Sequence, residues 1–143
     1  MTTRTEPEPD LVDALASAAF VVTGVLSRTA AEHDLSLTQL RVLGILRGRS
    51  PRMAELAAFL GLERSTTSGL VERGERRGLV TRTASAEDGR AVHVSLTPAG
   101  AEMAARGYER VHAELQPLVA NLDPRQQHAL AALLTALVPA TSG

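Results

Sequence analysis

The chain has 143 residues, of which 44% are hydrophobic, 22% charged and 2% aromatic, as in a globular domain of ordinary size. It contains no cysteine, which excludes a disulfide framework, a thiolate metal site and a thiol-based redox sensor. The few aromatic rings exclude a stacking platform for single-stranded nucleic acid or RNA.

Residues 1–9 are predicted to be a disordered tail. Glu6 and Glu8 alternate with Pro7 and Pro9 where a secretory signal would have an apolar core. No later apolar run is expected to be long enough to cross a bilayer. The chain is therefore predicted to be cytoplasmic and to have no membrane partner.

The basic residues, all 15 of them arginines, are distributed unevenly. Ten lie between Arg41 and Arg90 beside six acids, which makes this segment net +4, whereas the remaining five arginines and ten acids are net −5. A basic block between acidic flanks fits a nucleic-acid partner, but a charge run of this size is usually a solvated face. The motifs inside the block must decide between these two interpretations.

The first predicted element is a long amphipathic helix at about residues 10–33, capped by Asp10. Ser36 and Gln39 match a capping box that begins a second helix, which continues to about Arg47.

A short third helix is predicted to end at Gly61, and a fourth to begin between Glu63 and Ser65 and to end at Gly78. Glycine suits both ends because it readily adopts the left-handed conformation that closes helices. The fourth helix is predicted to bury Thr67, Leu70, Val71 and Gly74. Helix, tight turn and helix is the pattern of a helix-turn-helix.

After the fourth helix the apolar period becomes alternating, which predicts a small antiparallel hairpin. One strand contains Val80 and Arg82, the other runs from Val92 to Leu96, and the polar loop from Thr83 to Arg90 contains the turn signal Asp88-Gly89.

Two further helices are predicted. Thr97-Pro98 begins a long fifth helix that Pro117 is expected to kink or end, and Asp123-Pro124 with Gln126 begins a terminal helix that ends before Pro139. The predicted fold is mainly α with a small β-hairpin, in one domain spanning residues 10–143.

The fourth helix carries the candidate DNA contacts, because its exposed side has small hydroxyls and guanidinium groups and no large apolar residue. These candidates are Arg64, Ser65, Thr66, Ser68, Gly69 and Arg73. For this helix taken alone, a merely solvated polar face is an equally good interpretation.

The hairpin tip adds Asp88 and Arg90 to the candidates. An arginine on such a tip can enter a narrow, A/T-rich minor groove, whose negative potential favours a guanidinium, and Asp88 can orient it. Taken alone, the tip is also ordinary turn chemistry beside a surface arginine.

Taken together, four segments resemble the MarR family of winged helix-turn-helix regulators. They are GLERSTTSGLVER (61–73), RRGLV (76–80), DGR (88–90) and VSLTPAG (94–100). The resemblance covers nearly the whole chain in element order, and its most specific part is the Asp-x-Arg wing followed at a fixed distance by Leu-Thr-x-x-Gly.

The resemblance implies a winged helix-turn-helix at about residues 36–97, flanked by dimerisation helices at about 10–33 and 98–138. It implies a homodimer on double-stranded DNA, with recognition helices in successive major grooves, pseudo-palindromic half-sites about 10 bp apart and Arg90 in the minor groove. Family members commonly repress, and many release DNA when a small, often aromatic or phenolic effector fills a cleft between the dimerisation and DNA-binding parts.

Two positions depart from the family pattern. Glu63 stands where a serine often caps the recognition helix, and Glu is a poorer cap. Gly74 stands where a larger apolar residue is common, and a mid-helix glycine costs about 1 kcal/mol relative to alanine. The absence of cysteine excludes the peroxide-sensing branch of the family.

No enzyme, cofactor or metal site is predicted. The four histidines are scattered, and the sequence has no phosphate-binding loop, paired-histidine metal motif or nucleophile elbow. Met53 and Met103 are predicted to fill gaps in the core. The alternative that the sequence leaves open is a winged-helix protein-interaction module without DNA binding.

Overall fold

Six helices and one antiparallel hairpin make up the part of the chain that the computed structural model describes, which is residues 7–84, 87, 89 and 91–138. The elements are α1 (Leu11–Glu32), α2 (Leu37–Leu46), α3 (Met53–Leu60), α4 (Arg64–Arg76), β1 (Val80–Ala84), β2 (Val92–Leu96), α5 (Pro98–Val119) and α6 (Pro124–Leu137). The predicted fold class and element order are confirmed. Residues 1–6 of the predicted tail lie outside the described residues.

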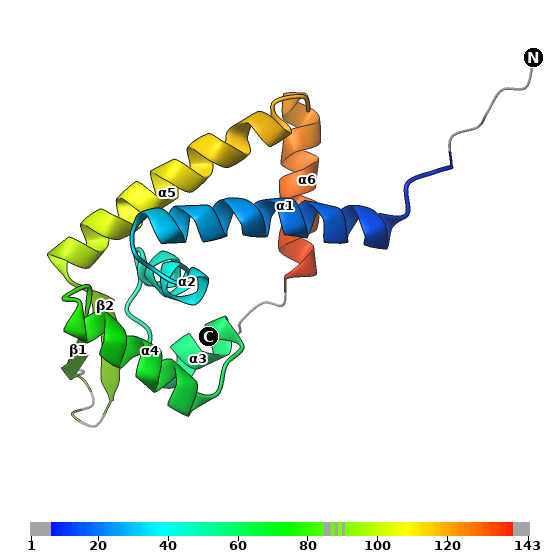
Figure 1. Ribbon diagram of the computed structural model, residues 1–143. Helices are drawn as coiled ribbons and strands as arrows, with labels where there is room; N and C mark the ends of the chain where they lie inside the picture. The colour runs from blue at the N-terminus through cyan, green and yellow to red at the C-terminus, as the bar shows by residue number, and fades with distance from the viewer. Residues whose placement is uncertain (1–6, 85–86, 88, 90, 139–143) are drawn as a thin grey trace, which may run out of the picture.

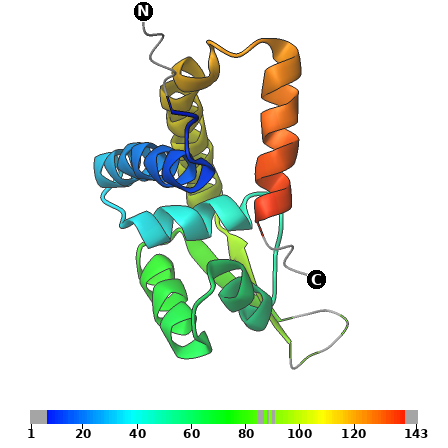
Figure 2. The ribbon, with the colours of Figure 1, turned by 90° about the vertical axis from the view of Figure 1, so that its right-hand side faces the viewer.

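The elements form a head and an extension (Figure 1). The head consists of α2, α3, α4 and the hairpin, and the extension consists of α1, α5 and α6. Both α1 and α5 pack against α2 of the head, and α5 also contacts β2. From the hairpin, α5 leads away from the head, and α6 turns back towards it, separated from the other helices in Figure 2. The helix pair α3 and α4 therefore lies in a different part of the molecule from the long terminal helices.

Local signals account for the helix ends. Three predicted N-terminal caps are present. The Asp10 side chain accepts a hydrogen bond from the N–H of Val12 at 3.1 Å. Reciprocal bonds between side chain and backbone join Ser36 with Gln39 (3.1 and 2.8 Å) and Asp123 with Gln126 (2.9 and 3.0 Å). Gly61 and Gly78 have φ values of +65° and +72°, as their predicted roles require. After α4, the N–H of Leu79 donates to the carbonyl of Gly74 at 2.9 Å, which closes the helix in a Schellman motif.

The core lies in the head, where α3, α4 and β2 meet. Leu56, Val71 and Val94 are fully buried there, and Met53 and Met103 pack against the core as predicted. The backbone N–H of Val94 also donates to the carbonyl of Pro51 at 2.9 Å, which ties the start of α3 to the hairpin. The hairpin and the helix pair are therefore one packed unit.

Close packing against β1 explains why a glycine stands at position 74 in the middle of α4. A Cβ built at Gly74 would lie 2.7 Å from Cγ2 of Val80, a distance that side chains do not tolerate. The missing side chain therefore lets β1 lie close against α4. Gly74 itself is half-buried rather than fully buried as predicted.

The long helix α5 contains Pro117 in its last turn and ends two residues later, at Val119. Proline lacks the N–H for the helical hydrogen bond to the preceding turn, so a helix tolerates it best near an end.

The strand β1 differs slightly from the prediction, because it continues through Ala84 into the segment expected to be loop.

The helix α1 overturns the expectation that no apolar run is long enough to cross a bilayer. Its 22 residues include an 18-residue window with a mean hydropathy of 1.5, enough by length and composition, and only 6% of that window is buried within the chain. The same composition serves a helix that packs against other helices, and α1 contacts α2 and α5. Much of its apolar surface is nevertheless uncovered, with Leu11 and Phe20 each 79% exposed.

Candidate nucleic-acid interface

Helix α4 brings together six of the eight predicted contacts. Its buried side consists of Thr67, Leu70 and Val71, which pack into the core. The predicted contacts all lie outside that arc, with Arg64, Ser65, Thr66 and Arg73 exposed and Ser68 and Gly69 half-exposed. Asp88 and Arg90 lie outside the described residues, so their placement stays a prediction.

The start of α4 is fixed by backbone geometry rather than by a side-chain cap. Glu63 occupies the N-cap with an extended backbone, and its side chain forms no capping hydrogen bond within the described part of the chain, in keeping with its poor capping chemistry. Its carbonyl instead accepts hydrogen bonds from the backbone N–H and the hydroxyl of Thr67, both at 3.0 Å. The buried threonine is thereby satisfied and the helix register is set.

Several arginines of the basic block are committed to the structure of the head. Arg41 on α2 donates to the carbonyls of Phe59 (2.8 Å) and Leu60 (3.2 Å) at the end of α3, which have no other hydrogen-bond partner among the residues described. The guanidinium groups of Arg47 and Arg49 lie over aromatic rings, at 3.8 Å from the centroid of Tyr108 and 4.9 Å from that of Phe59. These three arginines brace helices and are poorly placed to serve as DNA ligands.

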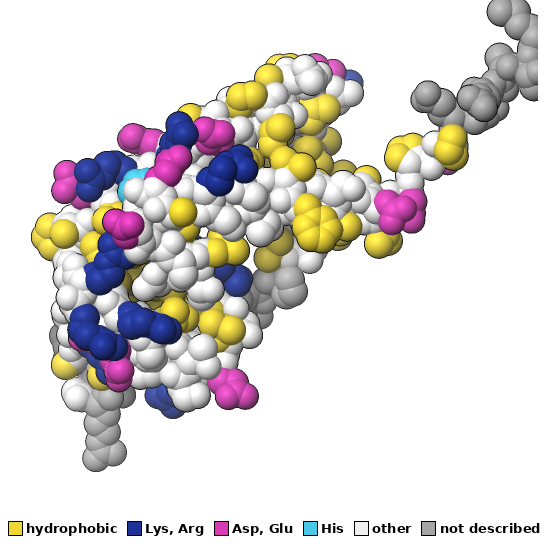
Figure 3. Space-filling model, in the orientation of Figure 1, with side chains coloured by type: hydrophobic (Ala, Val, Ile, Leu, Met, Phe, Trp, Pro, Cys, Tyr) yellow, Lys and Arg dark blue, Asp and Glu magenta, His cyan; other side chains and the backbone are white. Residues whose placement is uncertain are grey.

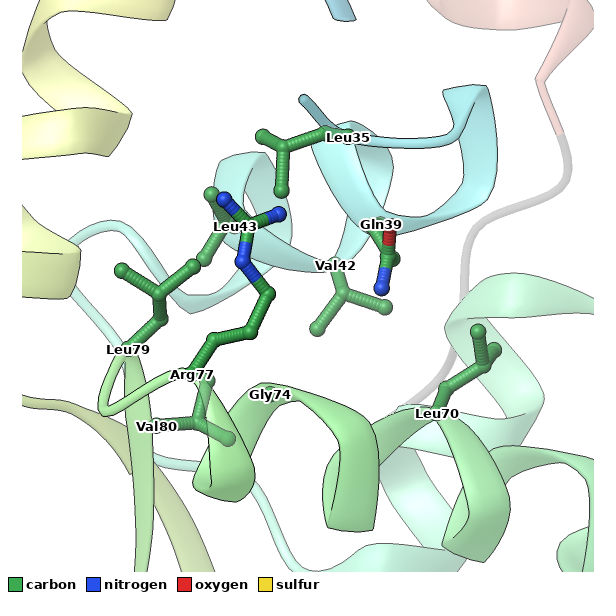
Figure 4. A pocket seen from close by; sticks show the side chains of 9 residues that line it. All are labelled: Leu35, Gln39, Val42, Leu43, Leu70, Gly74, Arg77, Leu79 and Val80. Carbon is green, nitrogen blue, oxygen red and sulfur yellow. The ribbon is translucent and has the colours of Figure 1, made fainter. Parts of the chain in front are cut away.

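Arg77 ties the end of α4 to the loop between α1 and α2. Its Nη1 donates to the carbonyl of Asp34 at 2.6 Å and its Nη2 to that of His33 at 3.3 Å. Figure 4 shows its side chain reaching across the small cavity between α2 and α4, beside Leu43 and Leu79. That cavity measures about 10 Å³, which is room for one water molecule and excludes an aromatic effector.

Four guanidinium groups of the basic block have no such partner within the described part of the chain. Those of Arg52, Arg64, Arg73 and Arg76 make no hydrogen bond, ion pair or ring contact with any residue that the structure describes. Three of them are on α4, and Figure 3 shows arginine side chains gathered over that part of the surface. A helix that exposes hydroxyls and unpaired guanidinium groups can bind phosphates and base edges.

Two of these residues, Arg52 and Arg76, were not among the predicted contacts. Arg76 lies seven residues after Gly69, and therefore on the same exposed side of α4, so helical periodicity carried one turn further would have identified it. Arg52 precedes α3, and only the fold brings it beside His93 of the hairpin. No local sequence signal indicates that position.

The histidines form no metal centre among the residues described, which contain no group of three or more His, Asp or Glu side chains placed to hold an ion. The Nδ1 atoms of His33 and His93 are instead 2.8 and 2.7 Å from the carbonyls of Thr29 and Ser50.

A shallow apolar hollow of about 290 Å³ lies along α5. Its lining consists of Tyr108, Val111, His112, Leu115, Gln116 and Val119. The ring of Tyr108 at one end is the ring over which Arg47 of the head lies. The hollow therefore adjoins a contact between the head and the extension.

Comparison with known proteins agrees with this geometry. The MarR family model matches residues 33–91, which contain the helix-turn-helix and β1. HTH-type transcriptional regulator YfiV of Bacillus subtilis strain 168, itself uncharacterised, is 33% identical over 98 residues, or 68% of this chain. The match spans 61% of the length of that relative.

Solved structures share the whole fold. Apo MarR from E. coli superposes with a TM-score of 0.75 at 23% identity, covering 94% of this chain and all of the other. A point mutant of S. aureus MepR, bound to an oligodeoxyribonucleotide, has a TM-score of 0.63 at 21% identity, covering 90% of this chain and 96% of the other. Residues 33–91 therefore belong to the MarR family, and the chain as a whole has the winged helix-turn-helix fold of the solved MarR structure.

Proposed function

We propose that the chain is a sequence-specific transcriptional regulator that binds double-stranded DNA and represses as a homodimer on a pseudo-palindromic operator. The observation that carries the proposal is the state of the arginines on α4. Arg64, Arg73 and Arg76 are unpaired among the described residues, while other arginines of the head are bonded internally. Family membership and the oligonucleotide-bound relative support the same function.

The proposed roles follow from side-chain chemistry. Ser65, Thr66 and Ser68 offer hydroxyls to base edges in the major groove, beside the guanidinium of Arg73, and Arg64 at the helix start meets phosphate. Gly69 adds no side chain between them, and the space beside it is open, since a Cβ built there would meet nothing within 4 Å. Arg90 is proposed for the minor groove, oriented by Asp88, on the sequence alone.

The proposed dimer is supported by uncovered apolar side chains on the terminal helices. No residue of α6 is buried within the described chain, and Leu133 and Leu137 are 65% and 63% exposed. Large apolar patches on α1 and α6 need a covering surface in water. A second copy of the chain supplies one with two-fold symmetry, which a pseudo-palindromic operator matches.

A small aromatic or phenolic effector is proposed for the hollow on α5, because its walls are apolar and His112 and Gln116 supply polar groups. Through Tyr108 and Arg47 the hollow adjoins the head, so a ligand there can favour one head position over another. The chain is proposed to act in the cytoplasm, as a regulator and not as an enzyme.

The test is electrophoretic mobility shift with the promoter duplex beside the chain's own gene, at increasing salt. We expect a specific complex whose affinity falls steeply with salt, because phosphate contacts release counterions. A shuffled duplex of equal length and composition is the control. Failure to bind any duplex, together with capture of a defined protein partner, would instead establish the protein-interaction alternative.

A further inference from the structure

The DNA-binding side proposed for α4 carries two carboxylates among its arginines. The helix contains three arginines and two glutamates, Glu72 and Glu75, and is therefore only net +1. Glu72 follows Ser68 by four residues and Ser65 by seven, so these three side chains are on the same side of the helix. An unpaired carboxylate in that position would repel the phosphates of a bound duplex.

Arg82 of β1 reaches both carboxylates from outside the helix. Its Nε lies 3.0 Å from Oε1 of Glu75, and its Nη2 lies 4.0 Å from Oε1 of Glu72. The arginine side chain is 33% exposed, compared with 37% for Glu75 and 59% for Glu72. The Arg82 side chain is thus clearly less exposed than that of Glu72, and its guanidinium adds one positive charge beside the helix.

The hairpin holds Arg82 in this place. Arg82 is the register partner of Val94, which is fully buried in the core. Val80, two residues earlier and on the same side of the strand, lies against Gly74 of α4. The side chain of Arg82 therefore leaves β1 next to the last turns of α4, and its backbone cannot shift without disturbing the core.

We infer that Arg82 is a positioning residue of the DNA-binding surface, which neutralises Glu72 and Glu75 so that α4 presents no unpaired carboxylate to the duplex. The inference rests on the proposed function and names a residue outside the recognition helix on which that function depends. The effect is electrostatic at short range, because exposed charges beyond about 8–10 Å are screened at physiological salt.

The test is a double-mutant cycle with a duplex that the wild-type protein selects from a random-sequence pool. R82Q should bind that duplex about tenfold more weakly at 0.1 M salt, because two carboxylates become unpaired near phosphate. In an E72Q/E75Q background, the same R82Q change should alter affinity less than about twofold, because nothing is left to neutralise. R82K, which keeps the charge, should restore most of the lost affinity.

Two controls separate this role from others. Arg106→Gln removes the same charge from an exposed position on α5 and should leave affinity nearly unchanged at 0.1 M salt. Thermal unfolding of each variant shows whether the hairpin stays folded, and the cycle compares only variants that unfold cooperatively. An equal loss from R82Q in both backgrounds would show that Arg82 contacts DNA directly and would overturn the inference. Wild-type protein that selects no duplex would overturn the proposed function instead.

Discussion

At the scale of single residues, the Leu-Thr-x-x-Gly signature acts as a clasp between α4, the hairpin and α5. Thr97 uses its N–H to bond the carbonyl of Leu79 (3.0 Å) and its hydroxyl to bond that of Gly78 (2.6 Å). The same hydroxyl accepts from the N–H of Gly100 at 3.0 Å and so caps α5. A Cβ at Gly100 would lie 1.8 Å from the carbonyl oxygen of Leu79. The motif is therefore explained by close packing of backbone on backbone.

Gly100→Ala should destabilise the protein by about 3 kcal/mol, because the new methyl group overlaps a backbone oxygen that cannot move aside like a side chain. The control is Gly44→Ala on the exposed side of α2, where a Cβ meets nothing within 4 Å. It should stabilise by about 0.5–1 kcal/mol through helix propensity. Urea unfolding measures both, and similar stability for the two variants would contradict the clasp.

Ser68→Ala should change operator affinity or base preference while leaving stability within about 0.5 kcal/mol of wild type, because the hydroxyl is proposed to contact a base edge. Ser27→Ala on α1 is the matched control and should change neither property. Selection from random duplexes measures preference and thermal unfolding measures stability. Unchanged affinity and preference would remove Ser68 from the contact surface.

At the scale of elements, α6 is a helix that packs against no hydrophobic core within the described chain. It buries no residue within the described chain, and its start depends on the reciprocal bonds of Asp123 and Gln126. Short helices are marginal in water unless they pack against something. Its stability should therefore depend on its cap and on the partner helix that the proposed dimer supplies.

Asp123→Ala should weaken the proposed dimer about thirtyfold, because losing an N-cap costs about 1 kcal/mol in each of the two protomers and α6 gains its packing only on association. Asp13→Ala, in the first turn of α1 but not its cap, is the control and should have a smaller effect. Sedimentation across a concentration series measures the dissociation constant. Equal constants for wild type and Asp123→Ala would separate α6 from dimer stability.

At the scale of the whole molecule, the head packs its own core while the extension leaves apolar surface uncovered. The buried residues are concentrated in the head, whereas Leu11, Phe20 and Leu133 on α1 and α6 are largely exposed. The head of a single copy is thus fully packed, whereas the extension leaves apolar side chains exposed to water. Association through the extension would fix the spacing of the two heads, which half-sites require.

Deleting residues 123–143 should give monomers with little operator affinity, because removal of α6 leaves too little surface for a stable dimer and two joined heads bind far better than one. Light scattering measures the oligomeric state and gel shift measures affinity. Circular dichroism checks that the head still folds. A truncated chain that remains dimeric would show that α6 is dispensable for association.

Helix ends could be predicted closely from the sequence, because the signals that create them are local. Asp10, Ser36 and Asp123 bond backbone groups two or three residues away, and Gly61 and Gly78 supply the conformation that ends a helix at that point. The exposed side of α4 could also be predicted, since helical periodicity separates it from the buried Leu70 and Val71.

Only the tertiary structure decided which of the described arginines have partners within the chain. Arg41, Arg77 and Arg82 look like the free arginines in sequence, but the first two bond carbonyls 18 to 44 residues away and the third bonds acids on α4. The fold likewise left α1 uncovered and placed the carbonyl of Leu79 where Gly100 has no side chain. Such partners come from distant segments packed together, and a local pattern of residue types carries no information about them.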